Sequence, residues 1–202
     1  GNLIGLALGG KSTLGNGQHG VGIYDGAMDN DVGSEYLQPN WIGGNGWSGV
    51  AIVNSDLNLI HGNYIGTDPS GVRKLGNASY GVHVVGGTDN SISSNTIAHN
   101  GADGVRIEGA TAVHNRITLN AITANGGKGI ENISGGNTEL APPVITSVTG
   151  GGVSGTACAG CTVEIFSDPA DEGQYVHSPP TAIADSSGNW SWSGSITGAN
   201  VT

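Results

Sequence analysis

The feature that most constrains the fold of this 202-residue chain is a recurring unit with asparagines at fixed positions. Each unit ends on Gly-Val-x-Ile or a close relative, and an asparagine stands four residues before the opening glycine. The clean units measure 23 residues, from Asn40 to Asn63, and 25 residues, from Asn95 to Asn120. Three asparagine series keep this phase: Asn16, Asn45, Asn77, Asn100 and Asn125; Asn2, Asn40, Asn63, Asn95 and Asn120; and Asn30, Asn58, Asn90 and Asn115. Self-similarity at a fixed period predicts a repeat architecture.

The pattern within each unit predicts a parallel β-helix of about five coils. Alternation at period two, as in Asn-x-Ile, indicates short strands with one buried face. Three such strands per unit fit one coil, and successive coils pair at about 4.8 Å. Ile and Val then form interior ladders, and stacked asparagine amides bond to one another and to the turns. The alternative, that Asn-Gly pairs mark β-hairpins, leaves three asparagine series in phase without an explanation.

Composition and charge exclude several classes of protein. The chain has 38 Gly, 36% hydrophobic residues and only 11% charged residues, so it is not a highly charged disordered chain. Its formal net charge is −10, and its longest basic cluster is Arg73-Lys74. We therefore expect no nucleic-acid partner and, because no apolar run approaches about 18 residues, no membrane insertion. The acidic, Lys-poor and Gly/Asn/Ser/Thr-rich composition is typical of secreted bacterial surface proteins, although no secretion signal opens the sequence.

A second, smaller domain is predicted after the repeats. The repeats occupy residues 1–136, and a Gly- and Pro-rich linker covers 137–143. Residues 144–202 read as short alternating strands of a small β-sandwich. An immunoglobulin-like sandwich normally needs about 100 residues, so this domain is either a fragment or is completed by a strand from a neighbouring molecule.

Two cysteines, Cys158 and Cys161, lie in this second domain. A lone Cys-x-x-Cys is weak evidence for zinc, and a thioredoxin-like redox motif would need a βαβ context that is lacking. We favour a small disulfide that closes a turn in an oxidising compartment. The alternative is a pair of reduced thiols.

The repeats between Asn2 and Ile133 resemble the right-handed parallel β-helix repeat family. The tail, with Gly155 to Phe166 and Asp185 to Trp190, is similar to the Ig-like modules that follow such helices in large bacterial surface proteins. The resemblance implies an all-β protein, with a right-handed parallel β-helix followed by an Ig-like β-sandwich. The family includes pectate lyases, polygalacturonases, alginate epimerases and many non-catalytic surface proteins, so the resemblance says little about function.

One outward column of the predicted strands carries candidate catalytic residues. The catalytic members of the family act on acidic polysaccharides with clustered carboxylates and a basic residue on one strand face. Here His83, Arg106 and Glu131 fall on adjacent coils, with Glu108 two residues beyond Arg106. A general acid/base pair is conceivable there. The alternative is plain ion pairing across neighbouring strands. The Asp-Pro-His-Asp signature of the alginate epimerases is absent.

Aromatic side chains are the second group of candidates. None of those in the repeats occupies a predicted inward position, and exposed rings at strand spacing can pack on sugar faces. The candidates for glycan binding or for an interface are Tyr24, Trp41, Trp47, Tyr64 and Tyr80. Trp41 and Tyr64 are expected to be neighbours on successive coils. The alternatives are that long loops or a neighbouring subunit cover these rings.

No metal site is predicted with any specificity. His61, His99 and His114 fall in different turn positions. The acidic run Asp25, Asp29, Asp31 and Glu35 offers hard oxygen ligands for calcium, but its spacing matches no known loop, and a solvated surface is the default interpretation. We therefore expect no cofactor, with calcium as the alternative.

The resulting hypothesis is a non-catalytic structural or adhesive module, secreted or on the cell surface. Its partners would be a polysaccharide, other surface proteins or copies of itself in a fibre. The alternative is a fragment of a lyase, hydrolase or epimerase that acts on acidic glycans.

Overall fold

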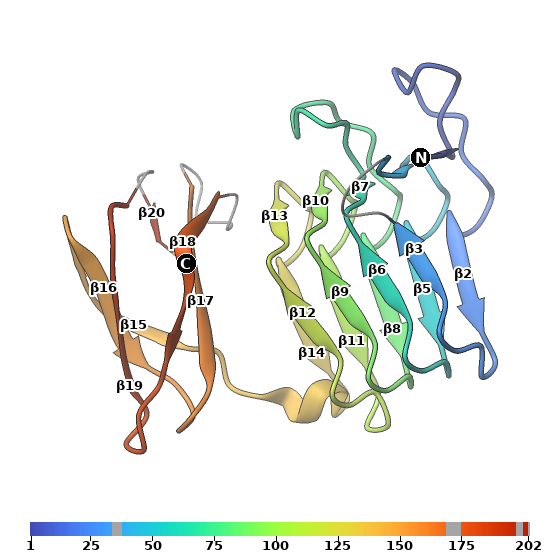
Figure 1. Cartoon of the computed structure of the whole chain (residues 1–202). Coiled ribbons are helices and arrows are strands. Elements are labelled where there is room, and N and C mark those ends of the chain that lie inside the picture. Colours follow the sequence, from blue (N-terminus) through green and yellow to red (C-terminus); the bar gives the residue numbers. More distant parts are fainter. Residues whose placement is uncertain (34–37, 169–174, 197–199, 202) are drawn as a thin grey trace. The chain divides into compact units, whose positions relative to one another are not determined.

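The structure of the chain is a computed structural model, and it divides into two compact units (Figure 1). The first unit is Gly1–Glu139 and the second is Leu140–Thr202. The structure describes the whole chain except residues 34–37, 169–174, 197–199 and 202. Each unit is described by itself.

The first unit is a parallel β-helix built from three parallel sheets (Figure 1). Sheet 1 consists of β1 (Leu3–Ile4), β4 (Trp41–Ile42), β7 (Tyr64–Ile65), β10 (Thr96–Ala98) and β13 (Ala121–Thr123). Sheet 2 consists of β2 (Val21–Tyr24), β5 (Val50–Val53), β8 (Val82–Val85), β11 (Val105–Glu108) and β14 (Ile130–Ile133). Sheet 3 consists of β3 (Asp31–Gly33), β6 (Leu59–His61), β9 (Ser91–Ser93) and β12 (Arg116–Thr118). The predicted solenoid is confirmed, with five strands in sheets 1 and 2 and four in sheet 3.

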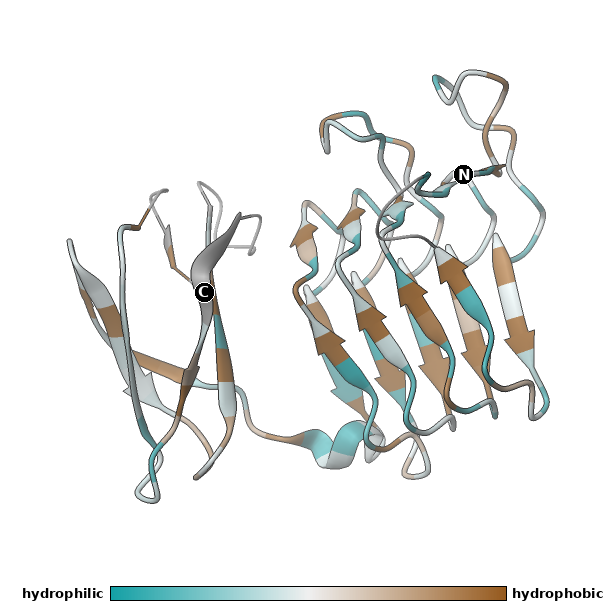
Figure 2. Ribbon diagram, in the orientation of Figure 1, coloured by the Kyte–Doolittle hydropathy of each residue, from teal (hydrophilic) through white to brown (hydrophobic). Residues whose placement is uncertain are grey.

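Aliphatic ladders fill the interior of this unit. In sheet 2, Ile52 pairs in register with Val84, which pairs with Ile107, and all three side chains are fully buried. Figure 2 shows the same hydrophobic bands repeating from strand to strand. Because the strands are short, each coil contributes only a few such residues, and full burial of each contributes about 1.5–3 kcal/mol. The hydrophobic core is therefore a column of equal layers.

Asparagine ladders line the corners, and each rung bonds to its neighbours. Asn45 Nδ2 donates to Asn77 Oδ1 at 2.8 Å, and Asn77 Nδ2 donates to Asn100 Oδ1 at 2.8 Å. Asn100 Nδ2 donates to Asn125 Oδ1 at 2.9 Å. The backbone N–H of each donor residue reaches the same acceptor oxygen. One amide thus satisfies the polar backbone of a buried corner as well as its own side chain.

The strands of sheet 2 are each followed by a residue with a left-handed backbone conformation. After each strand of sheet 2 the next residue has a positive φ: Asp25 (55°), Asn54 (48°), Gly86 (69°), Gly109 (100°) and Ser134 (53°). Asparagine, aspartate and glycine tolerate this region better than other residues. The corners are therefore sharp enough to return the chain to the next sheet.

Two inserted loops, residues 5–15 and 66–76, rise from the same edge of the first unit (Figure 1). Their bases close in the same way, because Leu14 N–H donates to Gly5 O at 2.8 Å and Leu75 N–H donates to Gly66 O at 3.0 Å. The second loop contains a turn in which Asp68 accepts the Ser70 hydroxyl at 2.6 Å. This hydrogen bond lowers the pKa of Asp68.

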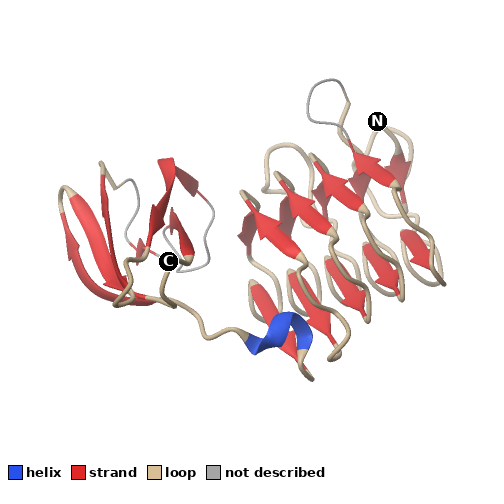
Figure 3. Cartoon of the chain, turned by 60° about the horizontal axis from the view of Figure 1, so that its bottom comes forward, coloured by secondary structure: helices blue, strands red, loops and turns tan. Residues whose placement is uncertain are grey.

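A short turn of helix, η1 (Gly136–Glu139), contacts β14 after the last coil (Figure 3). Asn137 continues the sheet 3 asparagine ladder, because its Oδ1 accepts Asn115 N–H at 2.9 Å and its Nδ2 donates to Asn115 O at 2.8 Å. Residues 137–139 of the segment expected to be a linker therefore belong to the first unit. The core column of sheet 2 ends in a polar residue, Asn132, which pairs in register with Ile107.

The second unit consists of two three-stranded antiparallel sheets. One contains β15 (Val144–Thr149), β16 (Gly152–Thr156) and β19 (Asn189–Ser193), and the other contains β17 (Thr162–Asp168), β18 (Tyr175–Ile183) and β20 (Asn200–Val201). Trp190 and Trp192 lie in its core with Val153 and Ile165. A disulfide joins Cys158 and Cys161 in the turn between β16 and β17. The Ig-like assignment of this unit stays a prediction.

Candidate functional site

The outer surface of sheet 2 gathers most of the candidate residues, and we call it the sheet 2 face. Three columns run along it, one residue per coil. The corner column, just before each strand, contains His19, Ser48, Tyr80, Asp103 and Lys128, which follow one another through backbone hydrogen bonds of the adjoining glycines. The first strand column contains Gly22, Ala51, His83, Arg106 and Glu131. The second contains Tyr24, Val53, Val85, Glu108 and Ile133.

Arg106 is the centre of a charged cluster on the last two coils. Its Nη1 donates to Glu131 Oε2 at 2.9 Å and to Asp103 Oδ2 at 3.4 Å, and its Nε donates to Glu108 Oε2 at 3.3 Å. Lys128 Nζ donates to the other Glu131 oxygen at 2.7 Å. The cluster thus places three carboxylates against two cations, and every formal charge in it has a partner.

Asp103 also fixes the backbone beneath the cluster. Its Oδ1 accepts the Lys128 N–H at 2.8 Å, while its Oδ2 faces Arg106. The side chain is only 9% exposed, and a buried carboxylate persists only when its oxygens have such partners. Asp103 therefore holds two successive corners together and orients the guanidinium above them.

Tyr80 joins the charged cluster to the rest of the face. The Arg106 guanidinium lies 5.0 Å from the centroid of the Tyr80 ring, which is cation–π distance. The ring centroids of His83 and Tyr80 lie 4.6 Å apart. His83 Nε2 is also 3.2 Å from Glu108 Oε2. These contacts pack Tyr80, His83 and Arg106 into one half-buried group.

An aromatic group occupies the first two coils of the same face. The Trp47 side chain is 51% exposed, and its ring meets the His19 ring edge-on at 5.1 Å. Tyr24 lies 6.4 Å from His19 and fills the space that a side chain on Gly22 would need. His19 Nδ1 accepts the Ser48 N–H at 3.1 Å, so that its other ring nitrogen carries the proton in the neutral imidazole.

The histidines of the face are neutral near pH 7, whereas Glu131 is ionised. Burial lowers the pKa of His19 and also that of His83. The hydrogen bond from Lys128, with the charge of Arg106, lowers the pKa of Glu131. A general acid of a glycosidase needs a raised pKa. Glu131 therefore does not have the protonation behaviour of such an acid.

The structure separates the five candidate aromatics into two groups. Tyr24, Trp47 and Tyr80 lie on the sheet 2 face, whereas Trp41 and Tyr64 are paired on sheet 1, with ring centroids 6.4 Å apart. Trp41 is half-buried, and its ring fills the space that a side chain on Gly10, in the first inserted loop, would occupy. The two sheet 1 rings are therefore not part of the aromatic group around Trp47.

The four candidate catalytic residues, His83, Arg106, Glu108 and Glu131, are brought together as expected from their columns. Three other members of the face, His19, Asp103 and Lys128, do not follow from the alternation within the strands, because they lie in the corner before each strand. A signal for them was present, since all three stand directly before the glycine of the Gly-Val-x-Ile string.

A comparison with known protein families finds a match for the first unit. The family described as periplasmic copper-binding protein (NosD) matches residues 11–141, well over half of the chain. The chain belongs to the NosD family. All three columns of the sheet 2 face lie within the range that matches NosD. No curated protein matches the sequence. Among the described residues, no helix is long and apolar enough to cross a membrane.

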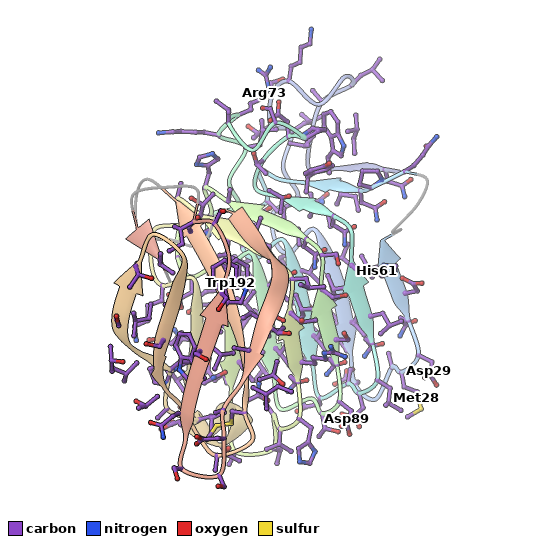
Figure 4. The ribbon with its side chains drawn as sticks, turned by 60° about the vertical axis from the view of Figure 1, so that its left-hand side comes forward. Met28, Asp29, His61, Arg73, Asp89 and Trp192 are labelled. Atoms are coloured by element: carbon purple, nitrogen blue, oxygen red, sulfur yellow. A yellow bond between two sulfur atoms is a disulfide. The ribbon has the colours of Figure 1, made fainter. Side chains whose placement is uncertain are left out.

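The described donor side chains of this NosD-family chain do not fit a copper site. Copper prefers thiolate, thioether and imidazole ligands. Both cysteines are joined in the disulfide, and Met28, the one methionine, lies apart from His61 (Figure 4). Across the ranges that the structure describes, no three His, Cys, Asp or Glu side chains are grouped so that they could hold a metal ion. We therefore assign no copper chemistry to the sheet 2 face.

The acidic run considered for calcium is spread over a corner and a strand. Asp25 and Asp29 have positive φ at turns, and Asp31 Oδ1 is paired with His61 Nε2 at 2.6 Å. Glu35 lies outside the described residues. The three described carboxylates do not form a group that could hold a metal ion.

Proposed function

We propose that this chain is a non-catalytic binding module of a secreted, cell-surface or periplasmic protein and that its sheet 2 face holds a glycan. The observation that carries the proposal is Trp47. Its side chain is half exposed, while two of the other three tryptophans, Trp190 and Trp192, are 4% exposed in the second unit. An exposed indole beside other aromatic rings offers a flat apolar surface, and sugars present a flat apolar face that packs on such rings.

The surroundings of Trp47 support this proposal. His19 holds the indole from one side, and Tyr24 continues the aromatic surface. The first strand column is occupied there by Gly22 and Ala51, and the Tyr24 ring lies over Gly22. Beneath the rings, β5 is paired with both β2 and β8 and is mostly buried, which keeps the aromatic group in place without a ligand. Such preorganisation favours binding, because little conformational freedom is lost.

The charged cluster supplies hydrogen-bonding groups beyond the aromatic surface. Carboxylates suit sugar hydroxyls, which can donate hydrogen bonds to them. An enzymatic role for the same cluster has weaker support. Arg106 lies between His83 and Glu131 in the first strand column. Every carboxylate of the cluster is engaged by a cation, and the lowered pKa of Glu131 disfavours proton donation. We therefore place binding ahead of the lyase, hydrolase or epimerase hypothesis.

The experiment is a binding screen of the full chain against immobilised oligosaccharides, followed by titration calorimetry. Trp47→Ala should weaken binding of any hit about tenfold or more, because a central aromatic contact commonly contributes over 1.4 kcal/mol. Leu59→Ala is the matched control. Leu59 is 45% exposed on sheet 3, so its removal should leave the affinity unchanged.

Two results would contradict the proposal. One is the absence of binding to every glycan in the screen. The other is binding that Trp47→Ala and Leu59→Ala reduce equally, since this would place the ligand elsewhere. Turnover of a glycan that Glu131→Gln abolishes would instead establish the enzymatic alternative.

A further inference from the structure

We infer that the glycan taken by the sheet 2 face is uncharged, not a polyuronate or another acidic polysaccharide. This inference rests on the proposed function, because it concerns the ligand of the same face. It follows from the state of the charges beside the aromatic group, and it predicts which sugars the module accepts and which it rejects.

The first step is that the Nε and Nη1 donors of Arg106 are already engaged by carboxylates of the protein. Recognition of an acidic sugar by arginine uses the fork of the guanidinium in a bidentate contact. Here Nε and Nη1 are already directed at Glu108, Asp103 and Glu131. One face of the guanidinium lies over the Tyr80 ring. The Nε–Nη1 edge and one face of the guanidinium are therefore occupied by the protein itself, which leaves less of it for a uronate.

The second step is the balance of charge on the face. The remaining cation, Lys128, is 70% exposed, and its ammonium is 2.7 Å from Glu131. Three carboxylates thus face two cations, and the two histidines add no positive charge near pH 7 because burial lowers the pKa of each. The local excess of negative charge, within a chain of formal charge −10, repels an acidic ligand. The cost of removing water from the carboxylate of such a ligand would not be offset by a new ion pair.

The third step is that the same groups suit hydroxyls. Glu108 is the most exposed carboxylate of the cluster, with 36% of its side chain accessible. Its bonds to His83 and Arg106 both end on Oε2. Oε1 has no partner among the described residues, so it can accept hydrogen bonds from a ligand. A fixed carboxylate is a strong acceptor for the hydroxyl of a neutral sugar.

The fourth step concerns the direction of the ligand. The aromatic group lies on the first two coils and the charged cluster on the last two, with Tyr80 and His83 between them. Coils are about 4.8 Å apart, so a ligand that reaches both groups runs across the strands, along the helix axis. Longer oligosaccharides should therefore bind more tightly than disaccharides of the same sugar.

The experiment compares charged and uncharged hexasaccharides on the full chain. The probes are cellohexaose, xylohexaose, mannohexaose and hexagalacturonate, with quenching or shift of Trp47 fluorescence and calorimetry as readouts. At least one neutral hexamer should bind at least tenfold more tightly than hexagalacturonate at 50 mM NaCl. Its affinity should change less than twofold at 500 mM NaCl, because no net ion pairing is involved.

A charge variant makes the test sharper. Glu108→Gln keeps the size of the side chain and releases Arg106 Nε, so that hexagalacturonate should gain at least threefold in affinity. Asp29→Asn is the matched control, because it removes the same charge from an exposed corner away from the face. It should leave the affinity for hexagalacturonate unchanged.

The outcomes separate the two proposals. Tighter binding of hexagalacturonate than of every neutral hexamer, still dependent on Trp47, would overturn the inference and leave the glycan-binding proposal intact. Equal gains from Glu108→Gln and Asp29→Asn would also overturn it, since the effect would then be that of net charge alone. Failure of every probe to bind would remove both proposals.

Discussion

At the residue scale, buried asparagine carries a structural role that its polarity would ordinarily forbid. Asn95 is 1% exposed, yet all of its polar groups are bonded. Its N–H and Nδ2 donate to Asn120 Oδ1 at 3.0 Å, and its Nδ2 also donates to Ile60 O at 2.8 Å. Its Oδ1 accepts from Asn63 in the preceding coil. No apolar residue can replace these contacts without leaving a buried N–H unpaired.

The prediction at this scale concerns one rung of the ladder. Asn95→Ala should lower the free energy of unfolding by about 2–4 kcal/mol, because the Asn63 N–H and the Ile60 carbonyl lose their partner in a buried corner. Urea unfolding followed by circular dichroism measures the change. Asn2→Ala, at an exposed position of the same series, should cost less than about 1 kcal/mol. Equal losses would mean that the ladder does not stabilise the coil.

Burial of the two histidines predicts how stability depends on pH. Since the pKa of His83, like that of His19, is lowered in the folded state, the unfolded chain takes up protons first as the pH falls below about 6.5. Stability should therefore decrease as the pH falls from 7 toward the folded-state pKa values. His83→Gln should make this decrease smaller, as measured by thermal unfolding at several pH values.

The control for this effect is His114→Gln. The His114 side chain is 76% exposed, so the change removes one imidazole without removing a buried one. If stability instead rises on acidification from pH 7 to 5.5, or if the two variants behave alike, burial of His83 is not the cause.

At the element scale, the corners decide where each strand stops and the next sheet begins. Gly66 ends β7 with a φ of 82°, and an added Cβ there would strike the Ala98 carbonyl and the Asn100 side chain of the next coil. Gly9, in the first inserted loop, has nearly the same φ, 85°, but open space around its Cα. A comparison of Gly66 with Gly9 therefore separates the energetic cost of a left-handed backbone from the cost of a steric clash.

Gly66→Ala should therefore destabilise the chain by about 3 kcal/mol, combining left-handed strain with the clash. Gly9→Ala should cost about 1 kcal/mol from strain alone. Chemical denaturation of both variants gives the comparison. A cost for Gly66→Ala no greater than that for Gly9→Ala would show that the two coils are not packed closely at this corner.

The strands and ladders could be predicted from the sequence because their spacing is a direct consequence of coil length. Asn77 stands four residues before Gly81, and Asn100 stands four residues before Gly104. This shared offset is enough to place Asn77 and Asn100 at the same corner of successive coils, where their side chains are hydrogen-bonded. The cover over Trp41 could not be predicted, because it depends on how the inserted loop folds back, which no periodicity encodes. The set of ion pairs predicted for Arg106 was incomplete for a related reason. Asp103 reaches Arg106 from a corner and not from a strand.

At the scale of the whole molecule, repetition and variation have separate roles. The inward residues of sheet 2 are aliphatic in the first four coils. The face beside them changes from the aromatic group of Tyr24 and Trp47 on the first two coils to the charged cluster of Arg106 on the last two. A flat surface of such graded chemistry suits an extended ligand better than a compact one. The range that matches the NosD family includes the sheet 2 face. The outward residues of this face differ from coil to coil, whereas the asparagine ladders repeat.

The most direct test of this account is two-dimensional NMR of the labelled full chain during titration with a neutral hexasaccharide. The account predicts shift changes at the Trp47 indole N–H and at the backbone of His19, His83 and Glu108. It predicts none on sheet 3 or at the indoles of Trp190 and Trp192. Shifts that cluster on sheet 3 or in the second unit, with the Trp47 indole unmoved, would contradict it.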